Sequence, residues 1–263
     1  MGQVELSFVI PAYNEDFIEE TLSELDKVSK NNLLTYEIVV VNDGSKYKTL
    51  SNAMMYANRN AHVKVISYPV NAGKGYAVKA GFMQTTGDIV VLVDSDMEID
   101  LSTISSYIDA LEHGDIVIAS KWHPDSAVEM PLARKIMNHG FNAMVRILTG
   151  APLKDTQAGL KALKKSAFVD IFPRLAVKRY ACDVELLAVA NLYGLKVVEM
   201  PLTLKMDASF NLKNVWRMFA NLLGIAYRLR ILRFYQKSFA YADDSERLMN
   251  RTKCYGHLQG SSI

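Results

Sequence analysis

Five runs rich in Val and Ile, separated by segments with helical periodicity, constrain the fold of this chain most strongly. The runs are nearly continuously apolar, which is typical of strands covered on both faces of a sheet. Strands that alternate with helices form a parallel sheet with right-handed crossovers. The predicted strands are Val4–Ile10, Tyr36–Asn42, Val63–Tyr68, Ile89–Asp94 and Asp115–Ser120, and the predicted helices between them are Asp16–Lys30, Tyr47–Asn60, Gly75–Thr85 and Leu101–Glu112. We therefore expect an α/β fold in which helices flank a mostly parallel, Rossmann-like sheet.

The regular alternation stops after Ser120. The later pattern predicts the helices Pro131–Leu148, Cys182–Tyr193 and Leu212–Gln236, a loop at Thr149–Gly159 and a strand at Lys196–Leu204. We find no internal repeat and no Pro- or Ser-rich linker. The predicted organisation is one catalytic-sized domain over 1–204, a helical appendage over 205–237 and a polar, mobile tail over 238–263.

Charge is distributed unevenly along the 263 residues, although the net charge is only +2. Residues 1–204 carry a net charge of −4, residues 205–237 carry +6 and the last 26 residues carry none. Near-neutrality argues against a general nucleic-acid binder, whereas the local basic block favours an anionic partner. No apolar run approaches the roughly 20 residues that span a bilayer, and the first residues do not form a signal peptide pattern. Cys182 and Cys254 form no disulfide framework, so we expect a reducing compartment.

Polar residues follow three of the predicted strands. The segments are Pro11-Ala12-Tyr13-Asn14-Glu15, Asn42-Asp43-Gly44-Ser45 and Asp94-Ser95-Asp96-Met97-Glu98. In parallel sheets, ligands bind beyond the carboxyl ends of the strands, so the three segments are expected to converge on one crevice. Two carboxylates separated by a single residue repel each other unless a cation lies between them, and Mg²⁺ or Mn²⁺ prefers such oxygen ligands. The Asn-Asp-Gly-Ser segment is also compatible with an ordinary turn and helix cap.

The segment Asn71-Ala72-Gly73-Lys74-Gly75 precedes the third predicted helix. Its small residues, exposed amides and lysine suit a phosphate at a helix N-terminus. It lacks the spacing of a P-loop and of a dinucleotide-binding fingerprint. Turn glycines alone are an alternative explanation.

These motifs, in this order and spacing, resemble those of the GT-A fold glycosyltransferases of family 2. The matching runs are F-V-I-P-A-Y-N-E, V-V-V-N-D-G-S, N-A-G-K-G and V-L-V-D-S-D. In the second half, Ser120-Lys121-Trp122-His123, Arg134, K-D-T-Q-A-G-L-K at 154–161 and D-V-E-L-L at 183–187 look like the dolichyl-phosphate glucose and mannose synthases, closest to the glucosyl branch. The resemblance covers about residues 4–236.

The resemblance implies inverting transfer of a hexose from a nucleotide sugar to a dolichyl or other polyprenyl phosphate. It assigns the donor to Pro11, Tyr13, Glu15, Asp43, Gly73, Lys74, Asp94 and Ser95, a Mg²⁺ or Mn²⁺ ion to Asp94, Asp96 and Glu98, and the acceptor phosphate to Lys121, Arg134 and Gln157. Asp96, Arg134, Gln157 and Asp183 are the candidate catalytic residues. The departing nucleoside diphosphate gains negative charge in the transition state, which a metal stabilises. The acceptor is already an anion, so a general base is not required.

Two features of the comparison with this family stay open. Asp183 and Glu185 are candidates without an assigned role, and their alternative is the ordinary presence of acids at a helix N-terminus. Close relatives usually carry Arg where Lys121 stands, and a lysine ammonium lacks the planar fork with which arginine binds a phosphate in a bidentate manner. Eukaryotic relatives of the glucosyl type carry an N-terminal transmembrane anchor, and some of the mannosyl type carry C-terminal spans. This chain shows neither pattern, so we expect peripheral attachment to the inner, cytoplasmic face of a membrane.

The basic segment provides a candidate for that attachment. Apolar residues of 212–232 recur at helical spacing beside Lys213, Arg217, Arg228, Arg230, Arg233 and Lys237. A basic amphipathic helix with Trp and Phe on its apolar side is typical of an interfacial element. A helix packed on the sheet with a solvated basic edge is the alternative.

The resemblance thus implies a metal-dependent hexosyltransferase, with transfer of glucose from UDP-glucose as the first hypothesis and of mannose from GDP-mannose as the second. Other readings are transfer to a sugar hydroxyl, nucleotidyl transfer, and a peripheral membrane protein that binds without turnover.

Overall fold

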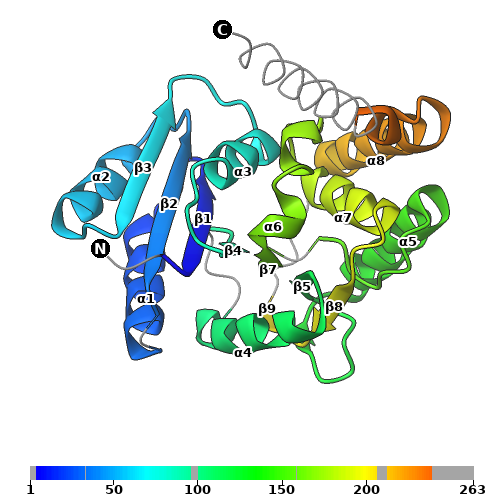
Figure 1. Ribbon diagram of the computed structural model, residues 1–263. Helices are drawn as coiled ribbons and strands as arrows, with labels where there is room; N and C mark the ends of the chain where they lie inside the picture. Colours follow the sequence, from blue (N-terminus) through cyan, green and yellow to red (C-terminus); the bar gives the residue numbers. More distant parts are fainter. Residues whose placement is uncertain (1–3, 33, 96–99, 158, 206–211, 239–263) are drawn as a thin grey trace, which may run out of the picture.

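The computed structural model describes residues 4–32, 34–95, 100–157, 159–205 and 212–238. Its centre is a seven-stranded sheet with the order β3-β2-β1-β4-β7-β5-β8 (Figure 1). The strands are β1 (Leu6–Ala12), β2 (Tyr36–Asp43), β3 (Val63–Tyr68), β4 (Ile89–Leu92), β5 (Ile116–Ala119), β7 (Lys161–Lys164) and β8 (Val197–Met200). The neighbouring pairs are parallel except that β7 runs antiparallel to both β4 and β5. The predicted α/β class and the five predicted strands are confirmed.

Helices cover both faces of this sheet (Figure 1). They are α1 (Ile18–Asn31), α2 (Thr49–Arg59), α3 (Lys74–Phe82), α4 (Ile104–Asp109), α5 (Leu132–Thr149), α6 (Lys165–Phe168), α7 (Cys182–Leu192) and α8 (Leu212–Ala226). Buried side chains of α1, α2 and α4 form one apolar core, and those of α3, α5, α7 and α8 form another on the opposite face. β1 and β2 are buried along nearly their whole length. β1 contributes to both cores, whereas Val39 and Val41 of β2 pack with Ala77 of α3 in a smaller third cluster.

After β3, the chain adds its next strand on the other side of β1, so the strand order changes direction. β1 pairs with β2 on one side and with β4 on the other, so the crossover from β3 to β4 passes over β2 and β1. α/β sheets bind their ligands at such a topological switch, which in this sheet lies at the carboxyl ends of β1 and β4 and is the expected crevice.

Several predicted elements differ in the structure. The strand expected at Lys196–Leu204 is broken at Pro201 into β8 and β9 (Thr203–Lys205), since proline donates no ladder hydrogen bond, and β9 pairs instead with β6 (Ala127–Glu129). The helix expected at Leu101–Glu112 is three short helical pieces.

The long C-terminal helix also differs from its prediction. The α-helix ends at Ala226 and continues as a π-helical turn, Tyr227–Ile231. Arg233 then adopts a positive φ of 49°, which breaks the helix before residues 234–238 become helical again. Lys237 thus lies in a helical turn, and the predicted tail from residue 239 onward lies outside the described residues.

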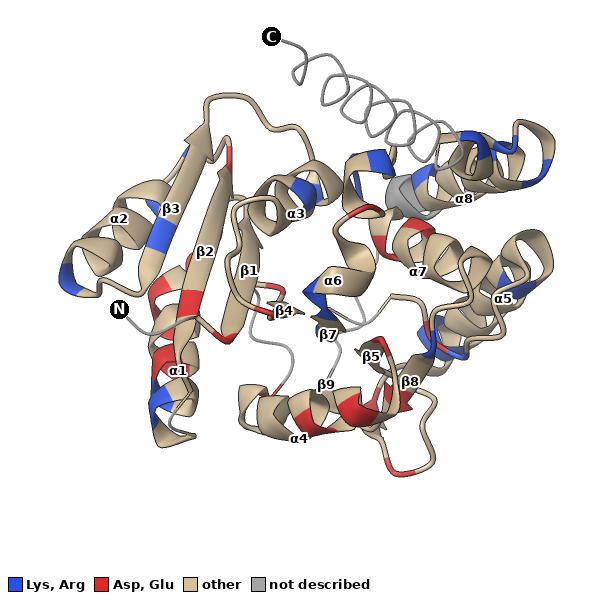
Figure 2. Cartoon of the chain, in the orientation of Figure 1, with Lys and Arg blue, Asp and Glu red and all other residues tan. Residues whose placement is uncertain are grey.

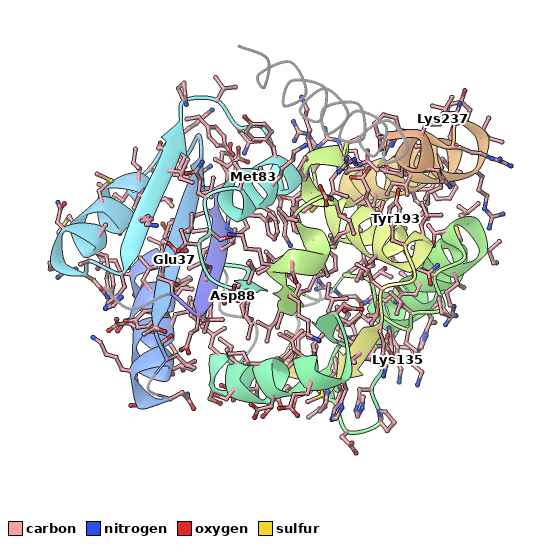
Figure 3. All side chains as sticks on the ribbon, in the orientation of Figure 1. Glu37, Met83, Asp88, Lys135, Tyr193 and Lys237 are labelled. Carbon is pink, nitrogen blue, oxygen red and sulfur yellow. The ribbon has the colours of Figure 1, made fainter. Side chains whose placement is uncertain are left out.

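A buried glutamate on β2 stabilises the sheet at the end away from the crevice. Glu37 (labelled in Figure 3) accepts hydrogen bonds from the Ser7 hydroxyl at 2.8 Å and the Thr86 hydroxyl at 2.7 Å, and its carboxylate lies 2.5 Å from the Lys64 ammonium. Burial raises the pKa of Glu37, but the hydrogen bonds from Lys64, Thr86 and Ser7 outweigh burial and lower it to about 2.

Glu37→Gln is expected to destabilise the fold by about 2 to 3 kcal/mol at pH 7, because a carboxylate with a depressed pKa stabilises the folded state above its unfolded pKa. The difference in unfolding free energy should shrink as the pH falls from about 4.5 toward 2. Urea unfolding at several pH values measures it, and a difference that is the same at pH 3 and pH 7 contradicts it.

Candidate active site at the carboxyl ends of the strands

The segments after β1, β2 and β4 are joined to one another by hydrogen bonds. The Asn14 amide donates to the Ser45 hydroxyl at 3.1 Å, and the Lys46 amide donates to the Asn14 side chain at 2.9 Å. The Ser95 hydroxyl donates to the Pro11 carbonyl at 3.2 Å. Asn14 has a positive φ of 55°, a conformation that asparagine tolerates well. The three polar strand ends therefore meet in one place, as the sequence predicts.

Asp43, at the end of β2, organises the loop that opens α3. Its carboxylate accepts hydrogen bonds from the Asn71 side-chain amide at 2.8 Å, the Ala72 amide at 2.7 Å and the Gly73 amide at 2.9 Å. Asp43 is 2% exposed. In this structure the aspartate predicted to bind the donor therefore fixes the backbone of the predicted phosphate loop, while contact with a donor stays a prediction.

Four charged side chains alternate in sign beside this loop, and we call them the charge cluster: Lys74, Asp94, Lys161 and Asp183. The Lys74 ammonium lies 2.7 Å from Asp94 and 3.2 Å from Asp183. The other oxygen of Asp183 lies 2.9 Å from the Lys161 ammonium. The cluster thus joins α3, the end of β4, β7 and the first turn of α7.

Two members of the cluster, Lys74 and Asp183, have shifted pKa values that favour their charged forms. Burial alone lowers the pKa of Lys74, but the carboxylates of Asp183 and Asp94 raise it well above its ordinary value. Burial raises the pKa of Asp183, but the ammonium groups of Lys161 and Lys74 lower it below its ordinary value. Both oxygens of Asp183 are engaged by lysines, so this carboxylate is suited to positioning Lys74 rather than to accepting a proton.

A close backbone approach brings the loop after α5 to Asp94. A Cβ atom added to Gly159 would lie 2.3 Å from the Asp94 carboxylate, so no larger residue fits without a shift. Gly159 of the D-T-Q-A-G-L-K motif therefore lies directly against the end of β4. Any ligand held at Asp94 would lie beside this segment.

Asp155 connects two of the residues predicted to bind the acceptor. The Lys121 ammonium lies 2.8 Å from Asp155, and both side chains are almost completely buried. The Lys121 and Gln157 amides also donate to Asp155, at 2.9 and 3.0 Å. Arg134 lies partly buried in the first turn of α5. Lys121 is therefore neutralised by Asp155, and its contact with an acceptor phosphate stays a prediction.

Of the remaining predicted site residues, some lie in the described ranges and others lie outside them. Tyr13 follows β1 and is 41% exposed, which leaves its ring accessible to a ligand. Asp96 and Glu98, predicted as metal ligands, lie outside the described residues. Within the described ranges, no three His, Cys, Asp or Glu side chains are grouped to hold a metal ion. Asp94 supplies the oxygen chemistry that Mg²⁺ and Mn²⁺ prefer, and Lys74 is the cation beside it in this structure.

Sequence reasoning gave no role to Lys161 or Asp155, although both belong to a motif that it singled out. Lys161 is 1% exposed and lies in β7 between the neighbouring strands. A lysine flanked by apolar residues in a short run is a signal of a buried ion pair, since a buried lysine requires a partner. The signal did not identify the partner, because Asp183 is distant in sequence.

This chain is similar in sequence to a known protein family and to several curated proteins. The profile of the family described as Glycosyl transferase family 2 matches residues 7–172. Dolichyl-phosphate beta-glucosyltransferase ALG5A of Trichomonas vaginalis is 35% identical over 76% of this chain and 65% of its own length. Dolichyl-phosphate beta-glucosyltransferase ALG5D of the same organism is 33% identical over 90% of this chain and 78% of its own length, and the Homo sapiens dolichyl-phosphate beta-glucosyltransferase is 31% identical over 74% and 66%. The chain thus spans about two thirds to three quarters of these relatives.

Solved structures share the fold at lower identity. Glucosyl-3-phosphoglycerate synthase of Mycobacterium tuberculosis, in complex with Mn²⁺, UDP-glucose and phosphoglyceric acid, is 20% identical with a TM-score of 0.62 over 85% of this chain and 79% of its own.

Proposed function

The chain belongs to glycosyl transferase family 2, and we propose that it transfers glucose from UDP-glucose to a dolichyl or related polyprenyl phosphate. The names of its relatives, which are dolichyl-phosphate beta-glucosyltransferases, support the sugar and the lipid. The observation that carries the proposal is the convergence of three strand ends on the charge cluster. It provides cations and a fixed amide loop where a nucleoside diphosphate departs.

In this proposal the protein's own residues hold the donor. Asp43 fixes the 71–73 loop so that Lys74 is presented at the crevice. Lys74 stabilises the negative charge that develops on the diphosphate. A Mg²⁺ or Mn²⁺ ion, held by Asp96 with Asp94 and Glu98, would supply further stabilisation of the same charge when bound. Tyr13, Glu15 and Pro11 would contact the nucleoside.

The environments of Asp94, Asp183 and Glu185 favour an anionic acceptor over a sugar hydroxyl. A hydroxyl acceptor requires a general base, whereas a lipid phosphate is already a nucleophile. Asp94 and Asp183 are paired with lysines, and Glu185 is completely buried. Positioning of the phosphate by Lys121, Arg134 and Gln157 would then contribute much of the rate.

The C-terminal region offers a surface that fits a membrane carrying such a lipid. No helix in the described ranges is long and apolar enough to cross a membrane. The exposed apolar side chains of α8 and the residues after it, which we call the apolar ridge, are Trp216, Leu223, Tyr227, Ile231, Leu232 and Phe234. Exposed cations lie among them and on α5 (Figure 2). Arg230 donates to the carbonyl of Ile147 on α5 at 2.7 Å. Lys135 and Lys237, both labelled in Figure 3, lie at the outer edge of the molecule.

This combination of exposed aromatic and aliphatic side chains with Arg and Lys is the composition of an interfacial element. The opposite side of α8 packs into the protein, since Leu222, Ile225 and Leu229 are buried in the core. We therefore propose peripheral binding to an anionic membrane surface through the apolar ridge.

The double variant Trp216→Ser, Ile231→Ser is expected to reduce binding to anionic vesicles at least about tenfold, because two exposed apolar side chains are removed from the ridge. Sedimentation with vesicles containing phosphatidylserine measures the bound fraction. Met55→Ser, which removes an exposed apolar side chain of α2, is the control and should bind as the unaltered protein does. Equal binding by all three proteins contradicts the membrane assignment.

A donor panel tests the transfer itself. The purified protein is given UDP-glucose or GDP-mannose with a short polyprenyl phosphate and Mn²⁺ or Mg²⁺. Labelled lipid product and release of UDP from UDP-glucose are expected. Product from GDP-mannose alone would support the second reading, and donor binding without release of the nucleoside diphosphate would make the protein a binder.

A further inference from the structure

Glu185 is a completely buried carboxylate outside the charge cluster, and its partners come from two distant parts of the chain. One of its oxygens accepts hydrogen bonds from the Ala176 and Val177 amides, at 3.0 and 2.8 Å. The other accepts from the Tyr235 hydroxyl and lies 3.3 Å from the Arg228 guanidinium. A buried charge is tolerated only when it is paired and hydrogen-bonded in this way. Glu185 therefore ties residues 228–235 to the segment 176–178.

The C-terminal partner of this link is firmly packed. Tyr235 is 0% exposed, and the Tyr193 hydroxyl donates to its carbonyl at 2.9 Å. The Arg228 side chain also donates to the Tyr235 hydroxyl at 3.1 Å. Burial and then the neighbouring Glu185 raise the pKa of Tyr235, so the phenol stays protonated and donates. Arg228 and Tyr235 both lie on the C-terminal segment that also carries the apolar ridge.

The other partner, the segment 176–178, contacts the phosphate loop directly. The Tyr76 amide donates to the Lys178 carbonyl at 3.2 Å. A Cβ atom on Gly73 would lie 2.4 Å from the same carbonyl, and Gly73 has a φ of 101°. Gly73 immediately precedes Lys74, whose ammonium belongs to the charge cluster. Movement of the 176–178 backbone would therefore displace the loop that presents Lys74.

We propose that Glu185 is a positioning residue through which residues 228–235 hold the loop of Gly73 and Lys74 in its donor-binding conformation. The consequence rests on the proposed function: a membrane bound at the apolar ridge and a nucleotide sugar bound at the crevice strengthen each other's binding. Such coupling is reciprocal by thermodynamic linkage, because the factor by which the membrane changes the donor's affinity equals the factor by which the donor changes the membrane's affinity. This gives Glu185 the role that its sequence position left open.

Tyr235→Phe tests the link with the smallest change, since it removes the hydroxyl that donates to Glu185 and keeps the ring. Amide hydrogen exchange of residues 73–78 should become at least about fivefold faster. The dissociation constant for UDP-glucose with Mn²⁺, measured by calorimetry, should rise about five- to tenfold. In turnover, the KM for the donor should rise while kcat at saturating donor changes less than about twofold. Glu185→Gln should act in the same direction.

Tyr107→Phe is the matched control, because it removes an equally buried phenol hydroxyl, bonded to the Pro201 carbonyl at 2.8 Å, from the opposite core. It should lower stability comparably without changing exchange at 73–78 or donor affinity. Phosphatidylserine vesicles without polyprenyl phosphate should tighten donor binding to the unaltered protein and not to Tyr235→Phe.

The outcomes separate the two proposals. If the unaltered protein does not bind UDP-glucose, the proposed donor is wrong, while exchange at 73–78 still decides the role of Glu185. If Tyr235→Phe and Glu185→Gln leave that exchange unchanged, or change it no more than Tyr107→Phe does, Glu185 does not position the loop. If exchange quickens but vesicles leave donor affinity unaltered, the coupling to the membrane is overturned.

Discussion

Asp96→Ala is expected to reduce glucose transfer to a short polyprenyl phosphate by at least about 1,000-fold in kcat, with Mg²⁺ or Mn²⁺ present. Asp96 is the second carboxylate of the pair that follows β4, whose first member, Asp94, already faces Lys74 at 2.7 Å. Loss of one group that stabilises developing charge typically costs about 100- to 1,000-fold, and loss of a metal ligand adds to it. The measurement is release of labelled lipid at saturating donor over a series of Mn²⁺ concentrations.

Asp109→Ala provides the control, because Asp109 is an exposed aspartate on α4 away from the strand ends. It should retain full activity with an unchanged requirement for metal. Thermal unfolding of both variants shows whether the chain is folded. A folded Asp96→Ala protein with full activity would remove the metal assignment from this residue.

Lys74→Met is expected to lower kcat/KM for the donor at least about 100-fold and to destabilise the fold by about 2 to 4 kcal/mol. The substitution leaves Asp183 with Lys161 alone and removes the ammonium from Asp94. Removal of one partner from a buried ion pair is costly because the other charge remains. Initial rates at varied UDP-glucose and urea unfolding measure the two effects.

The destabilisation has a defined pH dependence. The pKa of Asp183 is depressed in the folded state by Lys161 and Lys74, so its stabilising contribution is present above the unfolded pKa of about 4 and is lost as the pH falls below it. The stability difference between Lys74→Met and the unaltered protein should therefore be largest near neutral pH and shrink below about pH 4. Lys27→Met, which removes an exposed lysine of α1, should show neither effect. Normal donor kinetics in Lys74→Met would contradict the role of the cluster.

The sequence predicts the parts of this structure that depend on local patterns. Buried parallel strands have continuous apolar runs, so β1 to β5 can be predicted from the sequence alone. The topological rule for such sheets then brings Pro11, Asn42 and Asp94 to one edge without knowledge of any contact. The approximate position of the crevice therefore follows from strand ends alone.

Long-range pairing is the part that the sequence does not reveal. β7 is only four residues long and begins and ends with lysine, so its pattern does not indicate a central strand. The pairing of Lys121 with Asp155, and of Glu185 with Tyr235, joins segments 34 and 50 residues apart. Pattern rules describe which faces are apolar, but not which buried charges neutralise each other.

The position of β7 also determines the order in which the chain can fold during synthesis. β1 to β4 can pair with one another as they emerge, because each has its partner among the strands already made. β5 has no place beside β4 until β7, which lies between them, has been made. The edge of β4 that will pair with β7 therefore stays unpaired until β7 has been made. An exposed strand edge of this kind is a site where partly made chains aggregate. The donor half of the crevice is therefore expected to form early on the ribosome, and the half that closes on β7 only after residue 164 has emerged.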